Sequence, residues 1–179
     1  MTTTIHTPTY LSNLTPIRGI AALLTVIFHV DLMLGNGGDM LLKFSDSMFI
    51  NRLYLMVDLF FVLSGFVMLH VYGQWFSQSV NRVDFKRFTI ARFARVYPLH
   101  LAMLLITATI FGVSGLVGIP ENTIIQTENS LYSFVTNLLL LQSMNLHTWF
   151  SWDHASWSIS TEWWMYMLFP FLVRPFLGL

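Results

Sequence analysis

Residues 53–72 read LYLMVDLFFVLSGFVMLHVY, a run in which Asp58 is the only Asp, Glu, Lys or Arg. A helix of about 20 apolar residues is long enough to cross the hydrocarbon core of a bilayer. Four further apolar runs lie at 15–34, 96–117, 131–144 and 157–177. The third of these is shorter than a span, and the last is rich in aromatic residues. The pattern predicts an all-α, polytopic membrane bundle of four to five transmembrane helices.

The composition agrees with this interpretation. The chain has 179 residues, of which 55% are hydrophobic and 10% are charged, whereas about a quarter of the residues in a soluble domain are charged. Cysteine is absent, which excludes disulfides and thiolate chemistry. The sequence has no metal-ligand spacing, no phosphate-binding loop and no dinucleotide-binding glycine pattern. We therefore expect no metal, no tightly bound cofactor and no nucleic-acid partner.

The basic residues predict the orientation of the chain. We divide it into a short polar segment at 1–13 and a membrane domain at 14–179. The first apolar run lacks a small-residue cleavage site, so we expect a retained anchor rather than a signal peptide. The loop between the second and third runs carries Arg82, Lys86, Arg87, Arg92 and Arg95. By the positive-inside rule this loop is cytoplasmic, which places the N-terminus in the cytoplasm as well.

The fourth run, at 131–144, leaves two topologies open. If it crosses the membrane, the fifth run starts in the cytoplasm and Arg174 ends outside. If it only dips into the membrane, Arg174 ends inside, which fits the charge rule better. A short segment of this kind is tolerated where protein rather than lipid surrounds it. We favour the second topology.

Arg18 and His29 are eleven positions apart in the first run. This separation is close to three helical turns, so both lie on one face, roughly 16 Å apart along the axis. Arg18 is either an interfacial anchor or a phosphate-binding guanidinium. His29 is either a hydrogen-bonded core residue or a general base, for which imidazole is suited near neutral pH.

Arg92, Arg95 and Glu162 are further candidates. Arg92 and Arg95 are three apart and face the same way on a helix. They either satisfy the positive-inside rule or clamp a phosphate. Glu162 lies among tryptophans in the fifth run, where it either stays ionised beside a cation or relays a proton. If that run begins outside, Glu162 lies about 9 Å below the outer edge, close to the level expected for His29.

Asp58 and Ser64 are possible supporting residues in the second run. Asp58 either pairs with an arginine or histidine or faces a wet cavity. Ser64 and Gly65 form a small patch that permits close helix approach. Packing is favoured over a nucleophilic role for Ser64 because the flanking glycine pattern of a nucleophile elbow is absent. The histidines near the predicted membrane edges are interpreted as structural: His70, His100, His147 and His154.

Four motifs in order resemble those of the acyltransferase 3 family. They are Arg18 with His29, FFVLSGF at 60–66, RFARVYPLH at 92–100 and SWSISTEWW at 156–164. The resemblance extends over about residues 14–175. It implies a bacterial inner-membrane enzyme that acylates sugars of surface glycans or other hydroxyl acceptors. It also implies an acyl-CoA donor, often acetyl-CoA, that enters from the cytoplasm.

The resemblance also implies residue roles. Arg18, Arg92 and Arg95 serve the donor, His29 is the catalytic base, and Glu162 supports it. Members of the family usually have more spans than this chain, so the sequence is interpreted as the N-terminal half of such a domain. We expect a fragment, or a subunit completed by a missing C-terminal half or by another copy. An inactive remnant and a proton-coupled transporter remain as alternatives.

Overall fold

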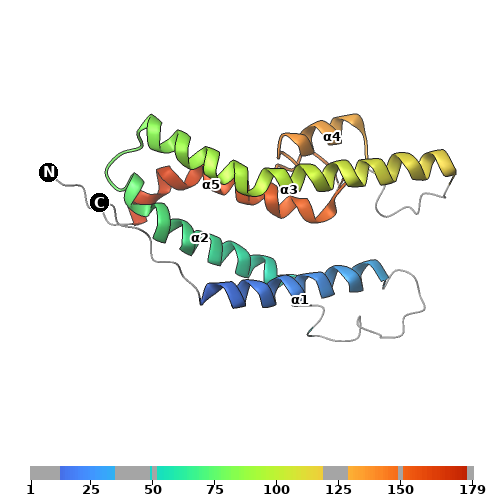
Figure 1. The fold of residues 1–179 in the computed structure, drawn as a ribbon, viewed down its shortest axis with the longest axis horizontal. Helices are drawn as coiled ribbons and strands as arrows, with labels where there is room; N and C mark the ends of the chain where they lie inside the picture. The colour runs from blue at the N-terminus through green and yellow to red at the C-terminus, as the bar shows by residue number, and fades with distance from the viewer. Residues whose placement is uncertain (1–12, 35–48, 50–51, 119–128, 149–150, 177–179) are drawn as a thin grey trace. The chain divides into compact units, whose positions relative to one another are not determined.

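The computed structural model describes residues 13–34, 49, 52–118, 129–148 and 151–176. Helices make up all the regular structure within these ranges. They are α1 (Leu14–Leu34), α2 (Leu55–Phe76), α3 (Arg82–Val117), α4 (Leu131–Leu138), the short 3-10 helix η4 (His154–Ser156) and α5 (Trp157–Phe176) (Figure 1). The chain divides into two compact units, Met1–Gln74 and Trp75–Leu179.

The predicted all-α membrane fold is confirmed. Among the described residues, three helices are long and apolar enough to cross a bilayer: α1, α2 and α3. The fourth run forms a helix of only 8 residues, which is about 12 Å long and too short to span. This length favours the topology in which the fourth run only dips into the membrane. Helix α5 has 20 residues and is not among these three.

Helix α3 begins well before the apolar run at 96–117 that predicted it. It starts at Arg82, after an N-cap at Asn81 whose side-chain oxygen accepts a hydrogen bond from the Asp84 backbone N–H at 2.9 Å. A side-chain acceptor at this position satisfies one of the unpaired N–H groups of the first turn. Hydropathy marks where a helix enters lipid, whereas the cap marks where it begins. Pro98 lies inside the helix.

In the first unit, α1 and α2 make few buried contacts. Ala21 is the one buried side chain of α1 in the described stretch 14–31, and Leu63 and Met68 are buried on α2. The rings of Phe28 and Tyr54 meet edge to face, with centroids 6.4 Å apart. Most other apolar side chains of α1 are exposed, as suits a helix that faces hydrocarbon.

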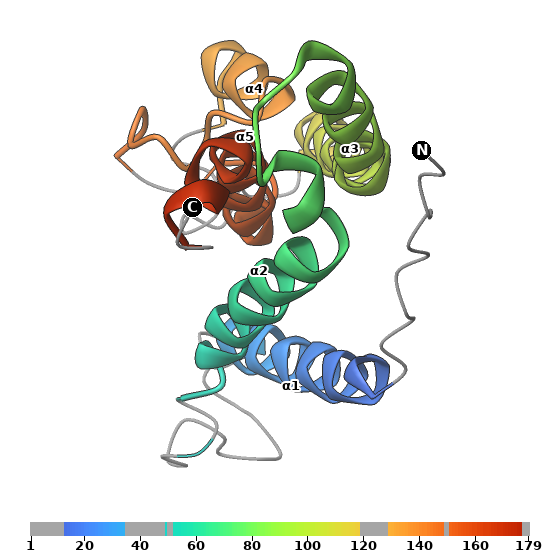
Figure 2. The same ribbon diagram turned by 90° about the vertical axis from the view of Figure 1, so that its left-hand side faces the viewer.

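In the second unit, α5 packs antiparallel against the N-terminal part of α3. The ring pairs are Phe85–Phe171, Phe88–Phe169 and Phe93–Trp163, with centroids 6.1, 5.9 and 5.5 Å apart. Residue numbers rise along α3 as they fall along α5, and the C-terminal end of α3 extends beyond α5 (Figures 1 and 2). Helix α4 joins α3 through the Tyr97 hydroxyl, which donates to the Leu138 carbonyl at 3.0 Å.

Candidate active site

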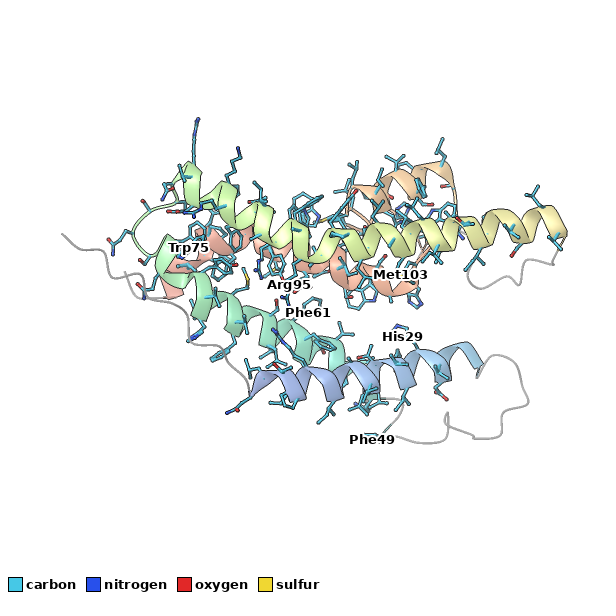
Figure 3. The ribbon with its side chains drawn as sticks, viewed as in Figure 1. His29, Phe49, Phe61, Trp75, Arg95 and Met103 are labelled. Atoms are coloured by element: carbon cyan, nitrogen blue, oxygen red, sulfur yellow. The ribbon has the colours of Figure 1, made fainter. Side chains whose placement is uncertain are left out.

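His29 projects from α1 and is half-buried (Figure 3). Its Nδ1 lies 2.8 Å from the carbonyl oxygen of Thr25, one turn earlier. A carbonyl only accepts hydrogen bonds, so Nδ1 carries the proton and Nε2 is the basic nitrogen of the neutral ring. The Phe28 ring lies edge-on to the imidazole at 5.5 Å between centroids. The imidazole is thus oriented and held in one tautomer by its own helix.

Arg18 lies on the same helix, as its spacing from His29 predicts. Its side chain is half-buried, and Nη2 lies 3.5 Å from the Leu63 carbonyl oxygen on α2. This distance is long for an N–H···O hydrogen bond. A guanidinium has five N–H donors, so this weak contact engages only a small part of its capacity.

The supporting candidates on α2 are Asp58 and Ser64. Asp58 is exposed in the first turn, where the helix dipole favours a carboxylate; within the described ranges it forms no ion pair with arginine or histidine. No described element packs closely against Gly65. A Cβ added to Gly65 meets nothing within 4 Å. Ser64 beside it is half-buried.

A second cluster joins Glu162, Tyr166 and Arg92 in the other unit. Tyr166 is 4% exposed, and its hydroxyl donates to Glu162 Oε1 one turn earlier on α5. The Arg92 guanidinium carbon lies 5.8 Å from the centroid of the Tyr166 ring, within the range of a cation–π contact. Sequence reasoning missed Tyr166, although the spacing of four between a carboxylate and a phenol was visible.

Arg92 and Arg95 do not share one environment. Arg92 is half-buried against α5, whereas Arg95, which is labelled in Figure 3, is exposed. A separation of three residues rotates the second side chain by about 60° from the first. This rotation moves Arg95 off the interface between α3 and α5, so its guanidinium is the more accessible of the two.

The loop before η4 fixes the start of α5, and therefore the position of Glu162. Leu140 is buried and has a positive φ of 56°, a strained conformation for a branched residue. Its carbonyl accepts hydrogen bonds from Ser160 Oγ at 2.7 Å and from Trp164 Nε1 at 2.8 Å. The two donors lie on either side of Glu162 in sequence, so one carbonyl holds both.

Asn137 on α4 is the centre of a buried polar network. Its Nδ2 donates to the Ser133 carbonyl and to Ser151 Oγ, both at 2.8 Å. Ser156 Oγ donates to its Oδ1 at 3.4 Å. His100 Nε2 donates to its backbone carbonyl at 2.9 Å. The structural interpretation of His100 is confirmed, because this histidine ties α3 to α4.

The domain family described as an acyltransferase domain matches residues 12–179, which include every candidate residue. The chain belongs to the acyltransferase 3 family. It is 35% identical over 130 residues to protein 2 in the picA locus of Rhizobium radiobacter, covering 70% of this chain and 61% of the relative. It is 32% identical over 120 residues to the acyltransferase MdmB of Streptomyces mycarofaciens, covering 66% of this chain and 28% of the relative.

The matched part of this family member therefore spans less than two thirds of either curated relative. No solved structure matches the chain. The acyltransferase 3 motifs fall in both units: His29 and Arg18 in the first, Glu162 and the Arg92/Arg95 pair in the second. The predicted meeting of His29 with Glu162 stays a prediction. Groups of three or more potential metal ligands are absent from the described residues.

Proposed function

We propose that this acyltransferase 3 member transfers an acyl group, with acetyl expected, from acyl-CoA to a hydroxyl of a carbohydrate. The observation that supports this most is the hydrogen bond from His29 Nδ1 to the Thr25 carbonyl at 2.8 Å. It leaves Nε2 as the basic nitrogen, which is the state a general base requires. The bilayer, acyl-CoA and the hydroxyl acceptor are the proposed partners.

The proposed reaction is a direct transfer. His29 Nε2 takes the proton from the acceptor hydroxyl as its oxygen attacks the thioester carbon. The carbon–sulfur bond then breaks, the ester forms, and the imidazolium returns the proton to the departing CoA thiolate. While His29 is charged, the Thr25 carbonyl accepts a stronger, charge-assisted hydrogen bond from Nδ1. The helix that carries the base therefore also stabilises its charged form.

The arginines are proposed to bind the phosphates of the donor. Arg95 is the principal candidate because its guanidinium is exposed, and a guanidinium binds phosphate through two parallel hydrogen bonds. Arg18 contributes its remaining donors. Arg92 packs on Tyr166 and supports this site from within the helix interface. We propose that the donor approaches from the cytoplasmic side of a bacterial inner membrane. Arg92 and Arg95 are expected on that side by the positive-inside rule.

Glu162 is proposed to stabilise the imidazolium. The Tyr166 hydroxyl donates a hydrogen bond to its carboxyl oxygen and orients that group. An ionised Glu162 provides the negative charge that a protonated His29 requires. This step depends on the two residues meeting in the assembled protein.

The test uses the full chain in proteoliposomes with acetyl-CoA and a sugar acceptor, and it follows CoA release and acylated product. His29→Gln is expected to lower turnover about 100- to 10,000-fold, the range for loss of a general base, with acetyl-CoA affinity unchanged. Asp31→Asn, on the same helix, is the matched control and is expected to retain turnover. Turnover in His29→Gln within threefold of the wild type would contradict the proposed base. Substrate flux without CoA release would instead indicate a transporter.

A further inference from the structure

Three basic side chains at the start of α3 have no part in the proposed reaction. Arg82, Lys86 and Arg87 are all exposed and lie within six residues. Within the described ranges none of them forms an ion pair. Asp84, the acidic residue of the same turn, instead receives a hydrogen bond from the side-chain amide of Asn81. The segment therefore keeps a net positive charge, with three cations against the single carboxylate of Asp84.

The contact between Arg87 and Trp75 places this segment at the membrane surface. Helix α2 has 22 residues and is about 33 Å long, which matches the hydrocarbon core. Trp75 is its penultimate residue and is 40% exposed, as is usual for tryptophan at the headgroup level. The Arg87 guanidinium carbon lies 5.9 Å from the centroid of its ring. Arg87 therefore lies at the depth of the lipid headgroups.

The exposed face of these first turns combines apolar and basic side chains. Val83 and Ile90 are 67% and 56% exposed, and their spacing of seven places them in one stripe. At 100° per residue, Lys86 and Arg87 project about 50° to either side of that stripe. An apolar stripe flanked by cations is the arrangement that binds the surface of a membrane, with the apolar groups towards the acyl chains.

The position of the cations in the helix adds to their effect. The N-terminus of a helix carries a partial positive charge, so cations in the first turns are unfavourable there unless an anion compensates them. We propose that Arg82, Lys86 and Arg87 bind the phosphate groups of anionic phospholipids in the adjacent leaflet. Each near-surface cation strengthens such binding about fivefold. The proposal does not depend on the proposed acyl transfer.

The test measures lipid preference directly. The full chain is purified in detergent, supplied with equal amounts of phosphatidylglycerol and phosphatidylcholine, and analysed by native mass spectrometry for bound lipid. We expect the wild type to retain phosphatidylglycerol preferentially. In the triple variant Arg82→Gln/Lys86→Gln/Arg87→Gln, the ratio of bound phosphatidylglycerol to bound phosphatidylcholine is expected to fall at least about tenfold, on the order of magnitude that three cations contribute. Arg52→Gln removes an exposed cation before the opposite end of α2 and is expected to leave the preference unchanged.

Two further experiments test whether the effect comes from charge rather than misfolding, and whether the site binds lipid rather than the acyl donor. Arg82→Lys/Arg87→Lys keeps the charge and is expected to keep the preference, with unchanged helix content by circular dichroism. Acetyl-CoA at saturating concentration is expected to leave bound phosphatidylglycerol in place. An unchanged preference in the folded triple variant would overturn the proposal. Displacement of phosphatidylglycerol by acetyl-CoA would do the same, because the surface would then belong to the donor.

Discussion

The two units differ in how their candidate residues are held. In the first unit, His29 is positioned by a carbonyl of its own helix, and the described part of α1 buries only Ala21. In the second unit, Glu162 is positioned by Tyr166 and by a loop pinned through Leu140. The comparison shows two ways to orient a polar side chain in an apolar setting: local helical spacing alone in the first unit, and local spacing together with a buried tertiary network in the second.

The largest effect is expected at the centre of the second unit. Asn137→Ala removes both amide hydrogen bonds and leaves Ser151 and Ser156 without their bonds to that side chain. Each buried polar group left unsatisfied costs about 1–3 kcal/mol, so we expect a loss of about 4 kcal/mol in unfolding free energy. Reversible unfolding in mixed micelles measures this. Gln78→Ala is the matched control, because Gln78 is an exposed amide of the same unit; equal losses in the two variants would show that the buried network adds no stability.

The first unit is expected to respond to added volume at one position. Ala21 is 1% exposed, and Ala21→Leu is expected to cost about 2 kcal/mol because overpacking forces neighbouring groups apart. Gly19 lies two residues earlier, and a Cβ added there meets nothing within 4 Å. Gly19→Ala should therefore stabilise the helix by about 1 kcal/mol. Thermal unfolding in detergent compares the two variants. An unchanged unfolding temperature for Ala21→Leu would contradict the buried contact at Ala21.

The hydrogen bond between Tyr166 and Glu162 in the second unit is tested by its effect on turnover. Tyr166→Phe keeps the ring beside Arg92 and removes the hydroxyl that donates to Glu162. A hydrogen bond to a charged group contributes about 1.5 kcal/mol, so we expect about a tenfold lower kcat with little change in the KM for acetyl-CoA. Glu162→Gln tests the same link from the other side, and its effect should not add to that of Tyr166→Phe. Fully additive losses would show that the two residues act separately.

The smallest effect is expected from exchanging the two arginines for lysine. Arg92→Lys weakens a cation–π contact and is expected to cost about 1 kcal/mol of stability. Arg95→Lys leaves stability unchanged because Arg95 is exposed, but it raises the KM for acetyl-CoA as bidentate phosphate binding is lost. Unfolding and steady-state kinetics on both variants measure the difference. Equal stability losses would place the two side chains in one environment.

Much of the fold was predictable because a helix that crosses lipid needs a long run of apolar residues. Runs of apolar residues predicted α1, α2 and α3, and helical spacing correctly placed Arg18 and His29 on one helix. The start of α3 was missed because a cap at Asn81 determines it, and no change in hydropathy marks that residue. For the fourth run, apolarity extended past Leu138, where the described helix ends.

The site was predictable only where it depends on local spacing. The contacts of Thr25 with His29 and of Tyr166 with Glu162 both follow the spacing of four that a helix creates, so the sequence contained them. The bonds that Leu140 accepts from α5 depend on the path of the loop between them. The different environments of Arg92 and Arg95 depend on which face of α3 meets α5, which periodicity alone does not give.

Pro98 has a consequence for hydration inside the membrane. A proline has no N–H, so the carbonyl of Ala94, four residues earlier in α3, loses its helical partner. In hydrocarbon an unpaired carbonyl costs several kcal/mol, and a neighbouring side chain or water has to supply the missing donor. Arg95 is the next residue, and its exposed guanidinium also requires polar surroundings. The turn from Ala94 to Pro98 is therefore expected to contact water or other protein groups rather than lipid acyl chains.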